Sequence, residues 1–140
     1  MIIVPYKAEH LMAITAQEAQ AYLRDLVTTE YCKSLEASLS FTAMVDGRPI
    51  GCGGLAEIWK DRALLWSFLD RSAKEHLFAI TKVTRNFIDA APYRRIEAET
   101  DCEFKEGHRW LRMLGFTLEA ERMRCFRVDG GDSALYAKVK

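Results

Sequence analysis

The sequence has no excess of charge of either sign and no long apolar run. Its 140 residues carry 20 basic and 20 acidic side chains, so the formal net charge is zero. A balanced chain has no overall attraction for nucleic acid or for anionic membranes. No segment approaches the ~18 apolar residues of a membrane span, and no N-terminal secretory signal is visible. We therefore expect a cytoplasmic protein that binds neither membranes nor nucleic acid.

Metal-binding and disulfide patterns are also absent. The four cysteines form no C-x-x-C pair, and no histidine stands near one of them at a zinc-ligand spacing. This spacing predicts no metal site and favours buried, reduced thiols over a disulfide framework. Only three prolines occur, and no repeat or linker interrupts the chain. With 49% apolar residues to fill a core, the sequence predicts one domain over residues 1–140.

Apolar spacing predicts an alternation of strands and helices. Strands are expected at 2–4, 41–45, 49–55, 63–69, 95–100, 118–128 and 134–139, and helices at 15–26, 30–39, 72–91 and 105–114. Thr15 with Glu18 and Ser72 with Glu75 match the capping box that opens helices. Asp46-Gly47 is typical of a two-residue hairpin turn. The order β-α-α-β-β-β-α-β-α-β-β predicts a mixed sheet of the α/β class, with α+β character.

The densest motif runs from Ile96 to Phe116 as a strand, a short loop, a helix and the ending Leu114-Gly115-Phe116. Gly115 can take the left-handed conformation that ends a helix, and Phe116 can then fold back as an apolar plug. In this element order the motif resembles the GNAT (GCN5-related N-acetyltransferase) superfamily, which implies the acyl-CoA N-acyltransferase fold. The stretches 47–54, 65–69 and 108–115 further resemble small GNAT-like proteins of tailed phages, including internal virion proteins of some podoviruses.

The resemblance implies an acetyl-CoA site after the fourth expected strand. In GNAT enzymes the pantetheine arm pairs with backbone at the end of that strand. The pyrophosphate lies on the N-terminus of the next helix, where free N–H groups and the helix dipole attract anions. The arm would then meet Ser67, Phe68 and Leu69. The pyrophosphate would meet the segment Arg71, Ser72, Ala73, Lys74, Glu75 and His76.

This phosphate-binding segment departs from the GNAT pattern Gln/Arg-x-x-Gly-x-Gly/Ala. Arg71 matches, but Lys74 and His76 stand where small residues let a phosphate approach the backbone. Glu75 can itself occupy the anion site. Arg71 and Lys74 can instead hold a phosphate through their side chains. An ordinary capped helix with a solvated first turn is the other interpretation of these residues.

The usual GNAT proton donor has no counterpart in this chain. Amine acetylation needs a base for the ammonium and an acid for the departing thiolate. Many GNAT enzymes carry a tyrosine acid on the helix before Leu-Gly-Phe, where this chain has Leu111. The loop position that is commonly asparagine is Phe104. Two departures in one motif point away from the standard chemistry.

Carboxylates are the substitute candidates for catalysis. Glu97 and Glu99 project to one side of their strand together with Asp101, and clustered carboxylates raise one another's pKa. Glu57 can serve as a base through water. The other interpretation is that all of them are solvent-facing charges. We interpret His108 as a surface or half-buried histidine rather than a catalyst.

Two functions follow from the resemblance. The first is acetyl-CoA-dependent N-acetyl transfer to an amine of a small molecule or protein. The second is a catalytically inactive GNAT-like phage protein with a virion-structural or host-interaction role, whose partner is a virion or host protein. Such a protein would act in the host cytoplasm or in the virion. GNAT-like domains often form homodimers, although no residue pattern here demands a dimer.

Overall fold

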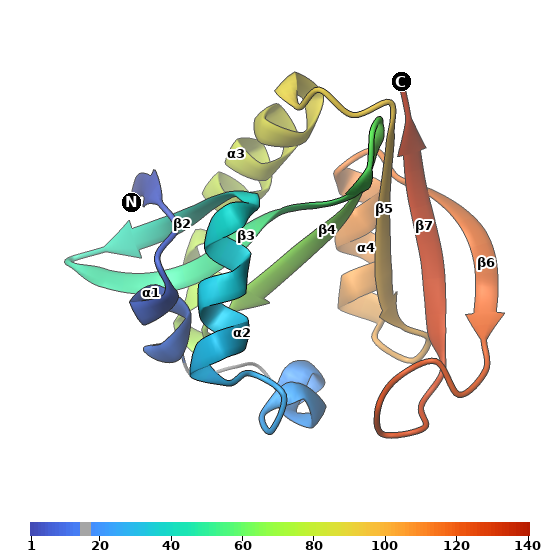
Figure 1. Cartoon of the computed structure of the whole chain (residues 1–140), viewed down its shortest axis with the longest axis horizontal. Helices are drawn as coiled ribbons and strands as arrows, with labels where there is room; N and C mark the ends of the chain where they lie inside the picture. The colour runs from blue at the N-terminus through green and yellow to red at the C-terminus, as the bar shows by residue number, and fades with distance from the viewer. Residues whose placement is uncertain (15–17) are drawn as a thin grey trace. The chain divides into compact units, whose positions relative to one another are not determined.

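The computed structural model describes the backbone of residues 1–14 and 18–140 (Figure 1). Within these residues, the strands are β1 Ile2–Pro5, β2 Leu39–Val45, β3 Arg48–Trp59, β4 Arg62–Leu69, β5 Arg95–Asp101, β6 Thr117–Met123 and β7 Ser133–Val139. The α-helices are α1 Ala8–Met12, α2 Thr29–Ser34, α3 Leu77–Ala90 and α4 Lys105–Met113, and the 3₁₀-helices are η1 Glu18–Leu23, η2 Leu35–Ala37 and η3 Arg71–His76.

The strands pair in the order β1-β2-β3-β4-β5-β7-β6. Strand β4 pairs with β5 in parallel over Arg62–Leu64, whereas β1–β2, β2–β3, β5–β7 and β6–β7 are antiparallel. This mixed sheet and the order of strands and α-helices confirm the fold class predicted from the sequence.

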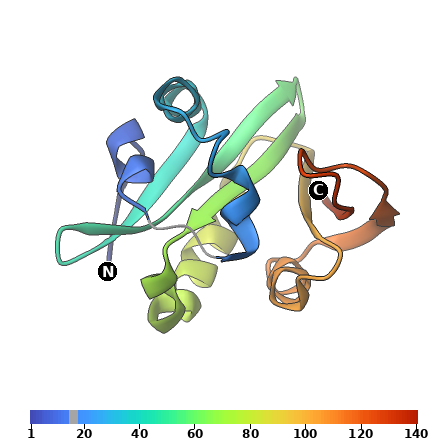
Figure 2. The ribbon, with the colours of Figure 1, turned by 90° about the horizontal axis from the view of Figure 1, so that it is seen from below.

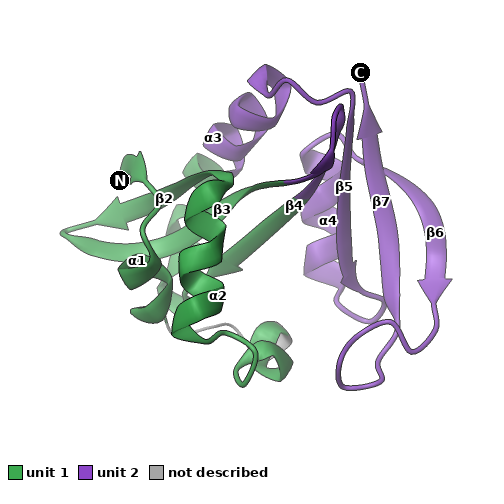
Figure 3. Ribbon diagram, in the orientation of Figure 1, with its two compact units in different colours: residues 1–56, 65–80 green, residues 57–64, 81–140 purple. Residues whose placement is uncertain are grey.

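The chain forms two compact units (Figure 3). Unit 1 comprises residues 1–56 and 65–80, and unit 2 comprises residues 57–64 and 81–140. Strands β3 and β4 and helix α3 contribute residues to both units. The end of β4 and all of η3 belong to unit 1, whereas β5, α4, β6 and β7 belong to unit 2.

In unit 1, helices α1 and α2 lie on one face of β2 and β3 (Figure 2). Tyr6, Cys32, Trp66 and Phe68 are buried in the core under these helices. The Tyr6 and Trp66 rings meet edge to face at 5.3 Å, and the Tyr6 hydroxyl donates to the Cys32 carbonyl at 2.8 Å. Because Trp66 and Phe68 are two residues apart on β4, their side chains lie on the same face of the strand, and both point into this core. They fix the backbone of β4 around Ser67.

In unit 2, the end of helix α4 has the geometry expected from the sequence. The Phe116 N–H donates to the Leu111 carbonyl at 3.0 Å, and the Gly115 N–H donates to the Arg112 carbonyl at 3.0 Å. Gly115 has φ +92°, the left-handed conformation of a Schellman C-cap. Phe116 is buried, as are Leu111 and Leu114 of the same turn. The prediction of a glycine stop with a folded-back phenylalanine is confirmed.

The N-terminal helices differ most from the sequence expectation. The expected capping box of Thr15 and Glu18 lies outside the described residues, because Thr15 and the Glu18 side chain are not described. Helix α1 was not predicted, and residues 18–23 form a 3₁₀-helix rather than an α-helix. Apolar residues three or four apart suit both helix types, so spacing alone does not separate them.

The second helix is shorter than the expected 30–39. Thr28 caps it by accepting the Tyr31 N–H at 3.1 Å, and η2 replaces its last turn. Leu39 already belongs to β2. The Asp46-Gly47 turn is confirmed, since both residues have positive φ, 49° and 74°, as a type I′ turn requires.

The cysteines are only partly buried. Cys32 and Cys52 lie in the core of unit 1 as expected, and burial raises the pKa of the Cys52 thiol to about 11. Cys125 is exposed, so the prediction of burial is wrong there. Its φ of +53° lies in the turn after β6, which ends at Met123 and not at the expected Val128. Among the described residues, no three His, Cys, Asp or Glu side chains gather as a metal-binding group, and no helix has the length and apolar character to cross a membrane.

Candidate functional site

The end of β4 presents backbone groups at a strand edge. The Asp70 N–H donates to the Ile50 carbonyl of β3 at 2.9 Å. Backbone groups of successive strand residues point in opposite directions. Phe68 and Asp70 therefore face β3, whereas Ser67 and Leu69 face the edge turned away from it. The Ser67 carbonyl and the Leu69 N–H are two of the groups that the sequence assigned to a pantetheine arm.

A glutamine side chain occupies this edge. Gln20 lies in η1, which crosses in front of β4 when the chain is seen from below (Figure 2). Its Nε2 donates to the Ser67 carbonyl at 2.7 Å, and its Oε1 accepts the Leu69 N–H at 3.5 Å. No sequence signal predicts this contact, because Gln20 is 47 residues from Ser67 and lies outside every recognisable motif. The edge can therefore hold a planar amide through one acceptor and one donor.

The segment after β4 opens differently from the expected helix. The predicted Ser72–Glu75 capping box is wrong: Asp70 is the cap, and its Oδ2 accepts the Ser72 N–H at 2.9 Å and the Ser72 hydroxyl at 2.6 Å. Residues 71–76 form η3, and the α-helix begins only at Leu77. Asp70 accepts the Ser72 N–H readily because a short acidic side chain bonds the backbone two residues on. One backbone donor of the expected pyrophosphate site is thus already used.

The side chains of η3 divide into a buried and an exposed set. Ala73 is 2% exposed and packs inward, so its side chain cannot face a ligand. Arg71, Lys74 and Glu75 are exposed, and His76 is half-buried. Arg71 and Lys74 therefore present two cationic side chains to solvent beside the end of β4. They suit a phosphate held by side chains rather than by backbone.

Glu97 is engaged by two arginines of unit 2. Arg62 donates to its carboxylate at 2.6 and 3.0 Å, and Arg95 donates at 2.7 Å. The Glu97 side chain is only 8% exposed. The Arg62 hydrogen bond, with the Arg95 bond and the two positive charges, lowers the pKa of Glu97 to about 2 despite the opposing effect of burial. A carboxylate held in this way is a weak proton acceptor at neutral pH.

Glu99 has a different environment on the same strand. It is exposed and forms no ion pair with the described part of the chain. Desolvation by surrounding protein atoms, and then the charge of Glu97, raise the pKa of its carboxyl. Contact with water limits the size of that rise. A raised pKa and an unpaired carboxylate are the properties of a general base.

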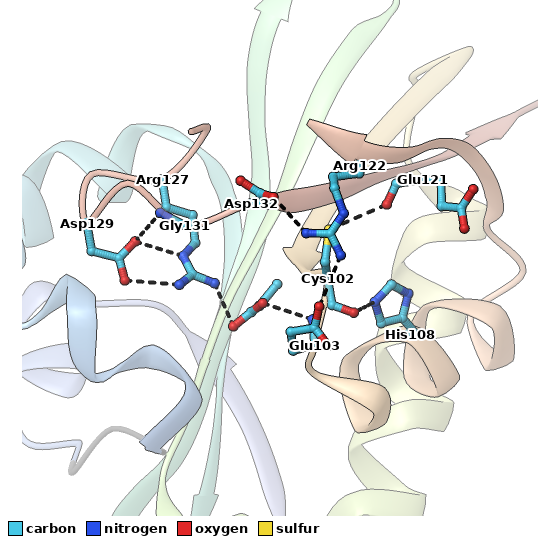
Figure 4. A network of polar contacts seen from close by, with 10 residues as sticks. Cys102, Glu103, His108, Glu121, Arg122, Arg127, Asp129, Gly131 and Asp132 are labelled. Atoms are coloured by element: carbon cyan, nitrogen blue, oxygen red, sulfur yellow. Dashed lines mark hydrogen bonds and ion pairs between the residues drawn. The ribbon is translucent and has the colours of Figure 1, made fainter. Parts of the chain in front are cut away.

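The third carboxylate of the row belongs to a surface network. Asp101 pairs with Arg127 at 2.6 Å, and Arg127 also binds Asp129 through two bonds of 3.0 Å. Figure 4 shows the neighbouring ion pair of Arg122 with Asp132, at 2.6 Å. These pairs hold the loop between β6 and β7, so the alternation that put three carboxylates on one side leaves Glu99 as the unpaired one.

Glu57 lies near the end of β3, beside the turn into β4, and is exposed. Burial, and then the charge of the nearby Glu57 carboxylate, raise the pKa of Tyr93. The carboxylate of Glu57 thus lies near a phenol of the same unit.

His108 is fixed by two hydrogen bonds. Its Nε2 lies 3.0 Å from the Cys102 carbonyl, and its Nδ1 lies 2.7 Å from the Tyr136 hydroxyl. A carbonyl only accepts, so Nε2 carries the proton and Nδ1 of the neutral ring accepts from Tyr136. Tyr136 is fully buried. The pair joins α4 to β7, which agrees with the interpretation of His108 as a half-buried structural histidine.

The fold is that of known acetyltransferases. No protein-family model and no curated protein matches the sequence significantly. Among solved structures, the ribosomal-protein-alanine N-acetyltransferase of Brucella melitensis is similar with a TM-score of 0.74 and 13% identity over 100% of both chains.

Two further structures agree with this result. A putative acetyltransferase of Salmonella typhimurium, yncA, solved with acetyl-CoA, has a TM-score of 0.74 and 14% identity over 99% of this chain and 93% of that one. A GNAT-family acetyltransferase of Bacillus anthracis has a TM-score of 0.71 and 12% identity over 98% and 93%. At such identities the likeness shows the GNAT acetyltransferase fold.

Proposed function

We propose that this protein binds acetyl-CoA and transfers the acetyl group to an amine of a small molecule or a protein. The observation that carries the proposal is the edge of β4, where the Ser67 carbonyl and the Leu69 N–H bond an amide. A pantetheine arm is a chain of amides, so it fits these two groups. The likeness in fold to a protein solved with acetyl-CoA supports the same assignment.

The phosphates would be held chiefly by side chains. The exposed cations Arg71 and Lys74 follow directly after β4, and Asp70 already occupies the Ser72 N–H. Exposed ion pairs weaken as salt screens them. The affinity for acetyl-CoA should therefore fall with rising ionic strength more steeply than backbone binding alone would produce.

Glu99 is the proposed base. Bound acetyl-CoA supplies a thioester whose acetyl carbon an amine can attack. Glu99 would accept the proton that the acceptor's ammonium group loses before its amine attacks. Leu111, which is 4% exposed, has no proton to give, so at this position the departing sulfur would leave as a thiolate. Glu97 stays ionised in its pairs with Arg62 and Arg95. Its proposed role is to stabilise β5 and not to transfer protons.

Calorimetric titration with acetyl-CoA at low salt tests the proposal. We expect micromolar binding, and then turnover with a panel of amines. Glu99→Gln should lower kcat by about 10²-fold, the typical contribution of a general base, with the Kd of acetyl-CoA unchanged. Glu121→Gln, at another exposed carboxylate of unit 2, is the matched control and should keep wild-type turnover. No binding at millimolar acetyl-CoA would refute the proposal.

One observation favours a second candidate, a non-catalytic scaffold. The Asp70 carboxylate sits at the start of η3, where it repels phosphate and uses a backbone donor. A chain that had lost acetyl-CoA binding would keep the fold and bind a protein, such as the virion or host component expected from the phage resemblance. Absence of acetyl-CoA binding together with a stable complex in a virion or host extract would support this candidate.

A further inference from the structure

We propose that Gln20 is an internal competitor of the acyl-CoA arm: its amide covers the edge of β4 in the free protein and must leave before the arm binds. The inference rests on the proposed function, because it concerns the same edge. It adds a built-in regulation that sets how tightly the edge is held.

The bonding of Gln20 imitates that of an extended chain. In a parallel pair, one residue donates its N–H to residue i of the neighbouring strand and accepts from residue i+2. Gln20 makes these two bonds with one side-chain amide, to the Ser67 carbonyl at 2.7 Å and from the Leu69 N–H at 3.5 Å. The Leu69 N–H has one proton and serves one acceptor well. A ligand amide at this position therefore excludes Gln20.

The contact is suited to exchange. Both bonds are neutral, and the bond to Leu69 is long, so their loss costs little once a ligand amide replaces them. Gln20 and Ser67 are half-buried, whereas the neighbouring Phe68 is 5% exposed and anchored in the core. Rotation of the Gln20 side chain thus frees the edge without moving β4.

The cover also has a cost for binding. A ligand that binds only the uncovered form has an apparent Kd equal to its intrinsic Kd divided by the uncovered fraction. Two neutral hydrogen bonds, one of them long, leave the edge uncovered for about a tenth of the time. Removing the amide of Gln20 should therefore tighten the binding of acetyl-CoA by about tenfold.

Gln20→Met tests the competition, because methionine has nearly the same length but forms no strong hydrogen bond. Calorimetry should give a Kd for acetyl-CoA about tenfold lower than that of the wild type. The Kd for ADP, which lacks the amide arm, should not change. Leu26→Met, at an exposed residue of the turn after η1, is the matched control and should bind as the wild type does. Gln20→Glu keeps the acceptor and loses the donor, so its Kd for acetyl-CoA should lie between those of the wild type and Gln20→Met.

Hydrogen exchange at one amide provides a readout without ligand. The Leu69 N–H should exchange faster in Gln20→Met than in the wild type. The Asp70 N–H, bonded to Ile50, should exchange at the same rate in both. Acetyl-CoA should restore the protection of Leu69 in the variant.

The outcomes separate this inference from the proposed function. If both proteins bind acetyl-CoA and the variant binds no more tightly, the competition is refuted and the proposed function stands. If neither binds, both fall, even where faster exchange at Leu69 shows that Gln20 does cover the edge. If the Leu69 N–H exchanges at the same rate in the variant and the wild type, the inference that Gln20 covers the β4 edge is also refuted.

Discussion

At the scale of single residues, Glu97 is a buried carboxylate that forms ion pairs with two arginines of unit 2. Its side chain is 8% exposed and bonds two arginines. Removing one member of a buried ion pair leaves the remaining charge without a compensating partner, which destabilises the fold. We expect Glu97→Gln to lower the free energy of unfolding by about 2 kcal/mol, measured by urea denaturation.

Glu119→Gln is the matched control for this prediction. Glu119 bonds the same Arg95, at 2.6 Å, but its side chain is 40% exposed. An exposed pair contributes about 0.5 kcal/mol or less. Equal losses for the two variants would mean that Glu97 behaves as a surface charge.

Residue roles are also where sequence prediction was weakest. The row of Glu97, Glu99 and Asp101 follows from strand alternation, and Arg95 precedes Glu97 by two residues on the same strand. Arg62 belongs to β4 and Arg127 to the loop after β6, so spacing could not show which carboxylate stays unpaired. The contact of Gln20 with the β4 edge depends on tertiary structure alone. The assignment of Ser67, Phe68 and Leu69 to a cofactor stays a prediction, now with a geometric basis.

At the scale of elements, the end of α4 depends on Gly115. Its φ of +92° is unfavourable for any residue with a Cβ, by about 1 kcal/mol. A Cβ there would also meet the flexible end of Lys138 at 3.0 Å. We expect Gly115→Ala to lower the free energy of unfolding by about 1 kcal/mol. Urea denaturation followed by the tryptophan signal would measure this loss.

Asparagine tolerates the left-handed conformation better than alanine does. Gly115→Asn should therefore be the less destabilised of the two variants. A loss for asparagine as large as that for alanine would argue that crowding, and not φ, sets the cost.

The elements that were predicted well are those with a local signal. The Asp46-Gly47 turn and the Leu114-Gly115-Phe116 stop each depend on a glycine with positive φ, so a few adjacent residues determine them. The start of η3 depends on which of Asp70 and Ser72 is the N-cap, and both residue types are good caps. The sequence alone did not decide it, and the structure shows Asp70 in that role.

At the scale of the whole molecule, acid should destabilise the fold. The pKa of Glu97 falls from 4.5 to about 2 on folding, and those of Asp89, Glu119, Asp129 and Asp132 are also lowered by basic partners. A lowered pKa in the folded protein means that the unfolded chain binds protons more tightly. The free energy of unfolding therefore decreases as the pH is lowered. Glu99, whose pKa is raised, acts in the opposite direction.

We therefore expect the urea midpoint to be nearly constant from pH 8 to about pH 5 and to fall between about pH 4.5 and pH 2. Glu97→Gln should show a shallower fall over the same interval, since one of the linked groups is gone. A wild-type midpoint that stays constant down to pH 3 would contradict the ion-pair assignment.

The overall fold could be predicted because the order of elements constrains the topology strongly. Alternating strands and helices in the second half of the chain leave few ways to build a mixed sheet. Helix type in residues 18–37 could not be predicted, since short amphipathic turns take their form from packing on β2 and β4 rather than from their own composition.

The amide of Gln20 also bears on how the free protein behaves in concentrated solution. A strand edge with an open carbonyl and an open N–H is a template on which another chain can add, which is the first step of edge-to-edge aggregation. Gln20 satisfies both groups at Ser67 and Leu69 from within the same chain. A side chain that delays a ligand thus keeps the vacant edge from recruiting a second molecule, and this gives a reason for a protein to retain such a contact.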